Sequence, residues 1–397
     1  MRNIHTLLIA QAMLLLCPIS TASAAPYIPQ DESQILERLP YRAENAEIRG
    51  IKSLQQNLAK NQANADLSAE LAERYYQQAL RQGDPRYIGY AESVLLPWKK
   101  QNNPPAKIRL VRAEIAQFLH DFPSAKTDLD AILQAEPDHL GARAVRAILL
   151  LVQAEFKSAR EDCRQLALRS PSLIAKACEL TVRAINGEAL VAYEALRTAL
   201  QQSPQAPSNE RRWVITRLAE IAQRLELNGE AEQHFQRAIA LDSNDQYLLA
   251  SYADFLLDQG QAQKAAQLLR GKERNDVLLF RWALAEKILR SSLADELKQQ
   301  ISERITAARQ RGDKLHLADE ASYELHFRHN PPEALKLAQE NWASLQREPS
   351  DVRLLLETAM AAGDATAAAP AIHWMQETRH EDPRLRQLMA RLQGKTP

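Results

Sequence analysis

The sequence of 397 residues predicts an all-α fold built from repeated helix pairs. Three observations support this prediction. The segment at residues 122–125 recurs in similar form at 156–159, an offset of 34 that also appears elsewhere in the chain. Apolar residues follow the spacing of one helix face, as between residues 248 and 256. No segment of strand length alternates polar and apolar residues, so we expect no sheet.

Residues 1–24 have the features of a secretory signal peptide. A short apolar core is followed by Ala22-Ser23-Ala24, the small-residue site that a signal peptidase requires. Cleavage would give a mature protein that begins at Ala25. The alternative is a lipoprotein signal that ends at Cys17, which the large Leu16 before this cysteine disfavours. We therefore expect an exported protein, with the periplasm as its compartment.

The remainder of the chain divides into three predicted parts. Residues 25–65 form a proline-containing leader and a capping helix at about 43–60. Residues 66–383 form about nine helix pairs with a period of 34 residues. Residues 384–397 form a C-terminal cap. The clearest interruption of the period lies at 204–209, where about five residues are inserted between units.

The repeat resembles the tetratricopeptide repeat family, whose unit is a helix–turn–helix of 34 residues. A small residue opens the second helix of the unit at Ala125, Ala159, Ala192, Ala231, Ala265, Ala334 and Ala368. A small residue in the first helix stands at Ala113, Ala147, Ala219 and Ala253, and a closing proline at Pro137, Pro171 and Pro204. The stretch 83–91, followed by Pro97-Trp98, resembles an uncharacterised exported bacterial branch of this family. The resemblance implies a right-handed superhelical solenoid with a concave groove lined by the first helices.

Three glycines are expected in the turns between paired helices. Gly229, Gly260 and Gly363 lie where the period places these turns. A left-handed backbone conformation costs glycine little because it has no Cβ atom. We therefore expect all three to take positive φ angles.

Composition excludes several function classes. Lys+Arg and Asp+Glu both number 50, so the sequence lacks the basic excess typical of nucleic-acid binders. The 11 glycines allow no phosphate-binding loop, dinucleotide-binding fingerprint or nucleophile elbow. His326 and His329 are three residues apart, but a helix C-terminus explains this pair as well as a metal does. We expect no catalysis, no cofactor, no metal and no membrane span.

Two cysteines remain after removal of the signal peptide, Cys163 and Cys178. They lie on the second helix of one predicted unit and the first helix of the next, which pack together. In an oxidising compartment an even pair favours a disulfide. The alternative is two buried small apolar residues.

The family geometry places eight residues in the concave groove as candidates for partner binding. They are Trp213, Arg217, Glu220, Arg224, Tyr247, Ser251, Asp254 and Asp258. Exposed inward residues should contribute little to folding, whereas aromatic and arginine side chains dominate binding energy at interfaces. The preceding units are apolar at their groove positions, which are Ala144, Ile148, Leu151, Ile174, Ala177 and Ile185. The leader or a partner could cover them.

These observations predict an exported scaffold that binds a peptide or a partner protein in its groove. The alternative is an accessory factor that assists assembly of an envelope metalloprotein or a membrane complex. The sequence does not identify the partner.

Overall fold

The computed structural model describes residues 46–84, 86–310 and 317–394. The protein divides into two compact units, residues 1–48 and 49–397. The predicted signal peptide and most of the predicted leader lie outside the described residues. The repeats all belong to the second unit.

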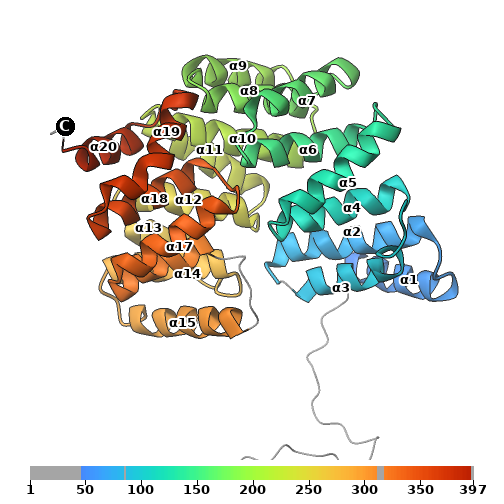
Figure 1. Cartoon of the computed structure of the whole chain (residues 1–397), viewed down its shortest axis with the longest axis horizontal. Helices are drawn as coiled ribbons and strands as arrows, with labels where there is room; N and C mark the ends of the chain where they lie inside the picture. The colour runs from blue at the N-terminus through green and yellow to red at the C-terminus, as the bar shows by residue number, and fades with distance from the viewer. Residues whose placement is uncertain (1–45, 85, 311–316, 395–397) are drawn as a thin grey trace, which may run out of the picture. The chain divides into compact units, whose positions relative to one another are not determined.

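The described part of the molecule consists of helices joined by short connections, with no strand (Figure 1). After α1 (Ala46–Lys60), eighteen α-helices follow one another as pairs, and α20 (Pro383–Leu392) ends the series. The pairs are α2 (Ala65–Gln82) and α3 (Arg86–Leu95); α4 (Ala106–Phe118) and α5 (Phe122–Ala135); α6 (Leu140–Val152) and α7 (Phe156–Arg169); α8 (Leu173–Ile185) and α9 (Ala189–Gln201); α10 (Ser208–Arg224) and α11 (Asn228–Leu241); α12 (Gln246–Asp258) and α13 (Ala262–Leu269); α14 (Asp276–Ile288) and α15 (Ala294–Gln310); α16 (Leu317–Tyr323) and α17 (Pro331–Ala343); α18 (Pro349–Ala362) and α19 (Ala369–Thr378). Short turns of other helix types are η1 (Leu96–Trp98), η2 (Glu324–Arg328) and η3 (Ala365–Ala368). The predicted all-α fold is confirmed.

The recurrent alanines are the points where helices meet. All seven that open second helices have no exposed surface: Ala125, Ala159, Ala192, Ala231, Ala265, Ala334 and Ala368. A methyl side chain lets two backbones approach closely, and a larger one would overpack the contact at a cost of about 1–3 kcal/mol. The 34-residue period of the sequence is therefore a period of helix contacts.

The turns within the pairs use the left-handed conformation at a recurrent position, but glycine does not always occupy it. Gly260 takes φ +69° between α12 and α13, as predicted. The prediction for Gly229 is wrong, because this glycine lies inside α11 and its φ is not positive. Glu226 takes φ +60° in that turn, and Ala154 takes φ +61° between α6 and α7. A single left-handed residue costs an L-amino acid about 1–2 kcal/mol, which the packed helix pair can offset.

Repeats that are distant in sequence also contact one another. The end of α8 and the start of α9 meet the segment before α20: the His380 Nδ1 atom lies 3.1 Å from the Ile185 carbonyl oxygen, and the Ala189 amide donates to Glu381 at 2.7 Å. The Arg347 amide donates to the Val152 carbonyl oxygen at 2.9 Å. These bonds join the middle repeats to the C-terminal repeats.

Apolar packing accompanies these hydrogen bonds. Ile185 is buried in one cluster with Trp374 and Leu385, and Leu151 and Phe156 pack against the same cluster. The C-terminal helices thus cover Leu151 and Ile185, two of the apolar groove positions. The sequence had suggested the leader or a partner for this role.

Candidate functional site

The eight candidate residues form two rows on neighbouring helices, here called the inner-face cluster. Trp213, Arg217, Glu220 and Arg224 lie on α10, and Tyr247, Ser251, Asp254 and Asp258 lie on α12. Both rows use spacings of four, three and four residues, which keep side chains on one helix face. Tyr247 is exposed over half of its surface, whereas the other seven residues are partly buried. The cluster is therefore more enclosed than the sequence predicted.

Glu220 joins the two rows. Its carboxylate accepts hydrogen bonds from the Tyr247 hydroxyl at 2.7 Å and from the Ser251 hydroxyl at 3.3 Å. It also pairs with Arg217 at 3.0 Å. The Arg217 guanidinium carbon lies 4.6 Å from the centre of the Tyr247 ring and 5.5 Å from that of Trp213. The aromatic rings and the carboxylate together hold this guanidinium in place.

Trp213 is less exposed than the sequence predicted. Its side chain packs against the core cluster of the middle repeats. A truncated side chain would lose these apolar contacts, so we now expect Trp213 to contribute to folding.

The two aspartates of α12 are neutralised by arginines from later helices. Asp254 pairs with Arg281 of α14 at 2.8 Å. Asp258 pairs with Arg353 of α18 at 2.8 Å and with Arg384 of α20 at 2.5 Å. Burial, the largest single influence, acts to lower the pKa of Arg281. The combined attraction of Asp254 and other acidic groups outweighs burial, so the pKa of Arg281 is raised. These carboxylates are thus largely satisfied within the protein.

Sequence reasoning missed Arg281, Arg353 and Arg384. One of them carried a signal that could have revealed it: Arg281 follows Tyr247 by the same 34 residues that separate Tyr247 from Trp213. Arg353 and Arg384 show no such relation to the cluster, because they reach it through contacts between distant repeats.

Arg224 has no partner among the described residues. Its Nε atom is buried without a hydrogen-bond partner, and the guanidinium makes no ion pair in the described part of the protein. Burial lowers the pKa of Arg224, and the nearby charges of Arg217 and Arg384 lower it further, against the attraction of Glu220 and Asp382. The planar fork of a guanidinium is complementary to a carboxylate, so an unpaired, partly buried arginine has the chemistry to accept one.

Glu348 contributes a group that titrates near neutral pH. It immediately precedes α18, and its amide donates to Asp351 at 2.9 Å. Burial and, to a smaller extent, the charge of Asp351 raise the pKa of Glu348 to about 7, although Arg217 opposes the shift. The electrostatics of the cluster therefore depend on pH in the neutral range.

Comparison with known proteins gives only distant likenesses. No family model matches the sequence, and no curated protein matches it. A tetratricopeptide repeat protein from Parabacteroides merdae is 17% identical, and the match spans 60% of this protein and 92% of that one with a TM-score of 0.45. The APC/C hetero-tetramer Cut9–Hcn1 is 16% identical, with 78% and 58% covered and a TM-score of 0.43. PilW, a widely conserved type IV pilus biogenesis factor, is 17% identical, with 51% and 95% covered and a TM-score of 0.40.

The protein's own helix pairs and its recurrent buried alanines define the fold. The fold is a solenoid of tetratricopeptide-type helix pairs.

A disulfide crosslinks two neighbouring units of the solenoid. Cys163 of α7 is bonded to Cys178 of α8, and their Cα atoms are 5.4 Å apart. The bond connects the second helix of one unit to the first helix of the next. It lies outside the inner-face cluster, and we assign it a structural role.

The histidines of the solenoid's α16–α17 region form no metal site within the described residues, where no group of three or more His, Cys, Asp or Glu side chains could hold an ion. His326 lies in η2, and burial lowers its pKa. Its carbonyl oxygen accepts a hydrogen bond from Lys287. Over the same described ranges, no helix is long and apolar enough to cross a membrane.

Proposed function

We propose that the protein is a non-catalytic scaffold whose inner-face cluster binds an acidic peptide segment of a partner protein. The observation that carries this proposal is Arg224, a guanidinium without a partner among the described residues, on an inner face where Arg217, Asp254 and Asp258 are paired. Tyr247, half-exposed beside Glu220, offers an aromatic surface to the same ligand. Arginine and tyrosine are among the residue types that most often dominate binding energy at interfaces.

The rest of the cluster holds these two residues in position. Glu220 fixes the Tyr247 hydroxyl, and Arg217 lies against its ring. A ligand carboxylate would replace solvent around Arg224 without displacing an existing ion pair. Charge-assisted hydrogen bonds of this kind contribute about 1.5–3 kcal/mol.

We also propose that the scaffold acts outside the cytoplasm. The signal peptide predicted at residues 1–24 and the disulfide between Cys163 and Cys178 support this setting, because disulfides persist in oxidising compartments. Mass spectrometry of the mature protein should find its N-terminus at Ala25. An intact Met1 in envelope fractions, or acylation at Cys17, would overturn this part of the proposal.

Site-specific photo-crosslinking tests the binding proposal. Tyr247 is replaced by the photoreactive residue benzoylphenylalanine, and a matched control places the same residue at Leu190 of α9, which is 57% exposed. We expect the photoreactive residue at position 247 to crosslink to one discrete protein. The same residue at position 190 should not crosslink to that protein. Its crosslinked segment should contain Asp, Glu or a C-terminal carboxylate. The identity of that protein also separates a general scaffold from an assembly factor for an envelope complex.

The variant Arg224→Gln completes the test. It retains much of the size and polarity of the side chain and removes its charge. Crosslinking from position 247 should fall at least tenfold, with the melting temperature nearly unchanged. Undiminished crosslinking in a folded Arg224→Gln protein would refute the role of Arg224.

A further inference from the structure

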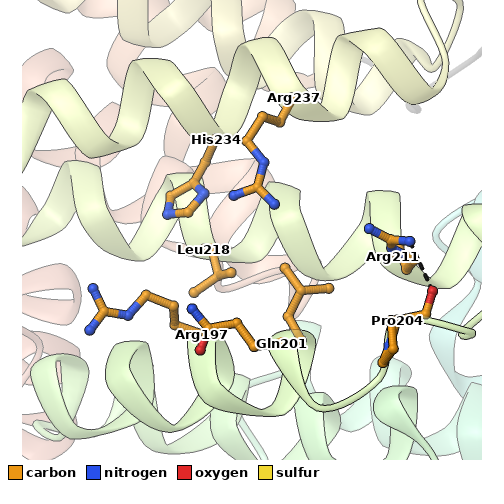
Figure 2. A pocket seen from close by; sticks show the side chains of 8 residues that line it. Arg197, Gln201, Pro204, Arg211, Leu218, His234 and Arg237 are labelled. Atoms are coloured by element: carbon orange, nitrogen blue, oxygen red, sulfur yellow. Dashed lines mark hydrogen bonds between the residues drawn. The ribbon is translucent and has the colours of Figure 1, made fainter.

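A second candidate site lies where the 34-residue period is interrupted, between α9, α10 and α11. A cavity of about 210 Å³ opens there (Figure 2). Its lining residues are Arg197, Leu200, Gln201, Pro204, Arg211, Leu218, His234 and Arg237. Pro204 belongs to the inserted segment, so the interruption of the repeat is what separates α9 from α10 at this point.

The lining is cationic and contains no carboxylate. Arg211 donates to the Pro204 carbonyl oxygen at 3.0 Å, and its Nε atom is buried without a hydrogen-bond partner. Arg197 pairs with Glu194, which is outside the lining. Arg237 makes no ion pair or hydrogen bond with any described residue. The cavity thus holds more positive charge than the neighbouring side chains neutralise.

His234 adds a buried nitrogen with no partner among the described residues. The residue is only 6% exposed; its Nε2 atom lies 3.0 Å from the Tyr193 hydroxyl, and its Nδ1 atom is buried without a partner. Burial and the nearby Arg237 lower the pKa of His234 to about 4, against the attraction of Glu230, so the ring is neutral at pH 7. When the Tyr193 hydroxyl donates to Nε2, Nδ1 carries the proton and can donate to a ligand.

The cavity is distinct from the inner-face cluster. Arg211 and Leu218 are seven residues apart on α10 and therefore share one side of this helix. Trp213 and Arg217 follow Arg211 by two and six residues, which places the row of the inner-face cluster on the other side of α10. Occupation of the cavity does not require the peptide site.

The chemistry of the lining suggests the class of ligand. Guanidinium groups from α10 and α11 and the buried imidazole face one cavity, as Figure 2 shows for Arg237 and His234. Leu200, Leu218 and Pro204 supply an apolar wall. The volume is below the roughly 300–1,000 Å³ typical of sites for drug-sized ligands. We propose that this cavity binds a small organic anion, consisting of a carboxylate or phosphate group on a short hydrocarbon body.

Calorimetric titration of the full mature protein at low ionic strength tests this proposal. The probes are n-butyl phosphate, butyrate, inorganic phosphate and uncharged n-butanol. We expect one of the two organic anions to bind, with n-butanol showing no binding and inorganic phosphate binding at least tenfold more weakly. The stronger of the two organic anions identifies the headgroup. Added salt should weaken binding, because the attraction is electrostatic.

Two variants localise the binding. Arg237→Gln should weaken it at least tenfold, whereas Arg386→Gln, which removes the same charge from an exposed position on α20, should change it less than twofold. The imidazole resonances of His234 should shift on titration of the wild type. Absence of binding by both organic anions at 20 mM, or unchanged binding in Arg237→Gln, would overturn the proposal. If inorganic phosphate binds as tightly as the organic anions, the cavity does not recognise a hydrocarbon body, and that part of the proposal is wrong.

Discussion

Asp258 on α12 accepts two hydrogen bonds from the Arg353 guanidinium on α18, at 2.8 and 3.0 Å, across 95 residues of sequence. Arg384 on α20 reaches the same carboxylate. One aspartate therefore connects a middle repeat to two C-terminal helices. Asp258 is also a residue that the sequence places in a binding groove.

Replacement of Asp258 by Asn should destabilise the protein. The side chain of Asp258 is only 11% exposed, and its loss leaves two partly buried arginines without their carboxylate. We expect a decrease of about 1–3 kcal/mol in the free energy of unfolding, measured by urea denaturation. Hydrogen exchange should show the loss of protection in α18 and α20. Glu161→Gln, which breaks an exposed pair with Arg164, is the control and should leave the free energy of unfolding nearly unchanged.

Reduction of the disulfide should lower the thermal stability of the solenoid. The bond between Cys163 and Cys178 closes a loop with a sequence separation of 15, for which the chain-entropy model gives about 3 kcal/mol. The melting temperature should fall when a reductant is added. The double variant Cys163→Ala, Cys178→Ala should not respond to the reductant. Two titratable thiols in denatured, non-reduced protein would contradict the bond.

His380 should make stability sensitive to acid. Burial and, to a smaller extent, the charge of Arg224 lower its pKa to about 4, so the folded protein holds the neutral ring at pH 7. A pKa below the unfolded value means that the contribution of His380 to stability is present above about pH 6.5 and is lost as the pH falls toward 4. His380→Asn retains a short polar side chain near the Ile185 carbonyl oxygen. Its unfolding free energy should decrease less than that of the wild type between pH 7 and pH 4, measured by urea denaturation at each pH.

Glu348 should have the opposite pH dependence. Its pKa is raised to about 7, so its contribution to stability is present below about pH 4.5 and is lost as the pH rises through 7. Glu348→Gln cannot ionise and should not show this loss. We expect the stability of the variant relative to the wild type to increase between pH 5 and pH 8. A difference that is constant across this range would show that burial does not shift the pKa of Glu348.

Local features of the fold could be predicted from the sequence because each repeat specifies its own helix contacts. Ala125 and Ala231 each have an alanine counterpart 34 residues later in the sequence, and both are fully buried where helices meet. Gly260 takes its left-handed turn as predicted, whereas Glu226 takes the turn that had been assigned to Gly229. Packing within the pair can impose a left-handed angle on residues other than glycine, so the presence of glycine was an incomplete guide.

The candidate site was harder to predict, because its composition depends on contacts between distant repeats. A 34-residue period specifies which helices pack against their immediate neighbours. It does not specify that Arg353 and Arg384 reach Asp258, or that Ile185 lies against Trp374. The sequence could thus place the two rows on α10 and α12, but not Arg353 and Arg384, which neutralise Asp258.

The hydrogen bonds between the end of α8 and the segment before α20 also affect how the protein folds and how it can be shortened. An array in which each unit touches only its neighbours behaves as a one-dimensional system, and its end units can unfold singly. Here the His380–Ile185 and Glu381–Ala189 contacts span 195 and 192 residues, so loss of the last helices exposes apolar surface in the middle of the array. We therefore expect the repeats from α8 to α20 to unfold as one cooperative block. Because such contacts close long loops, this block should also fold more slowly than an open array of equal length.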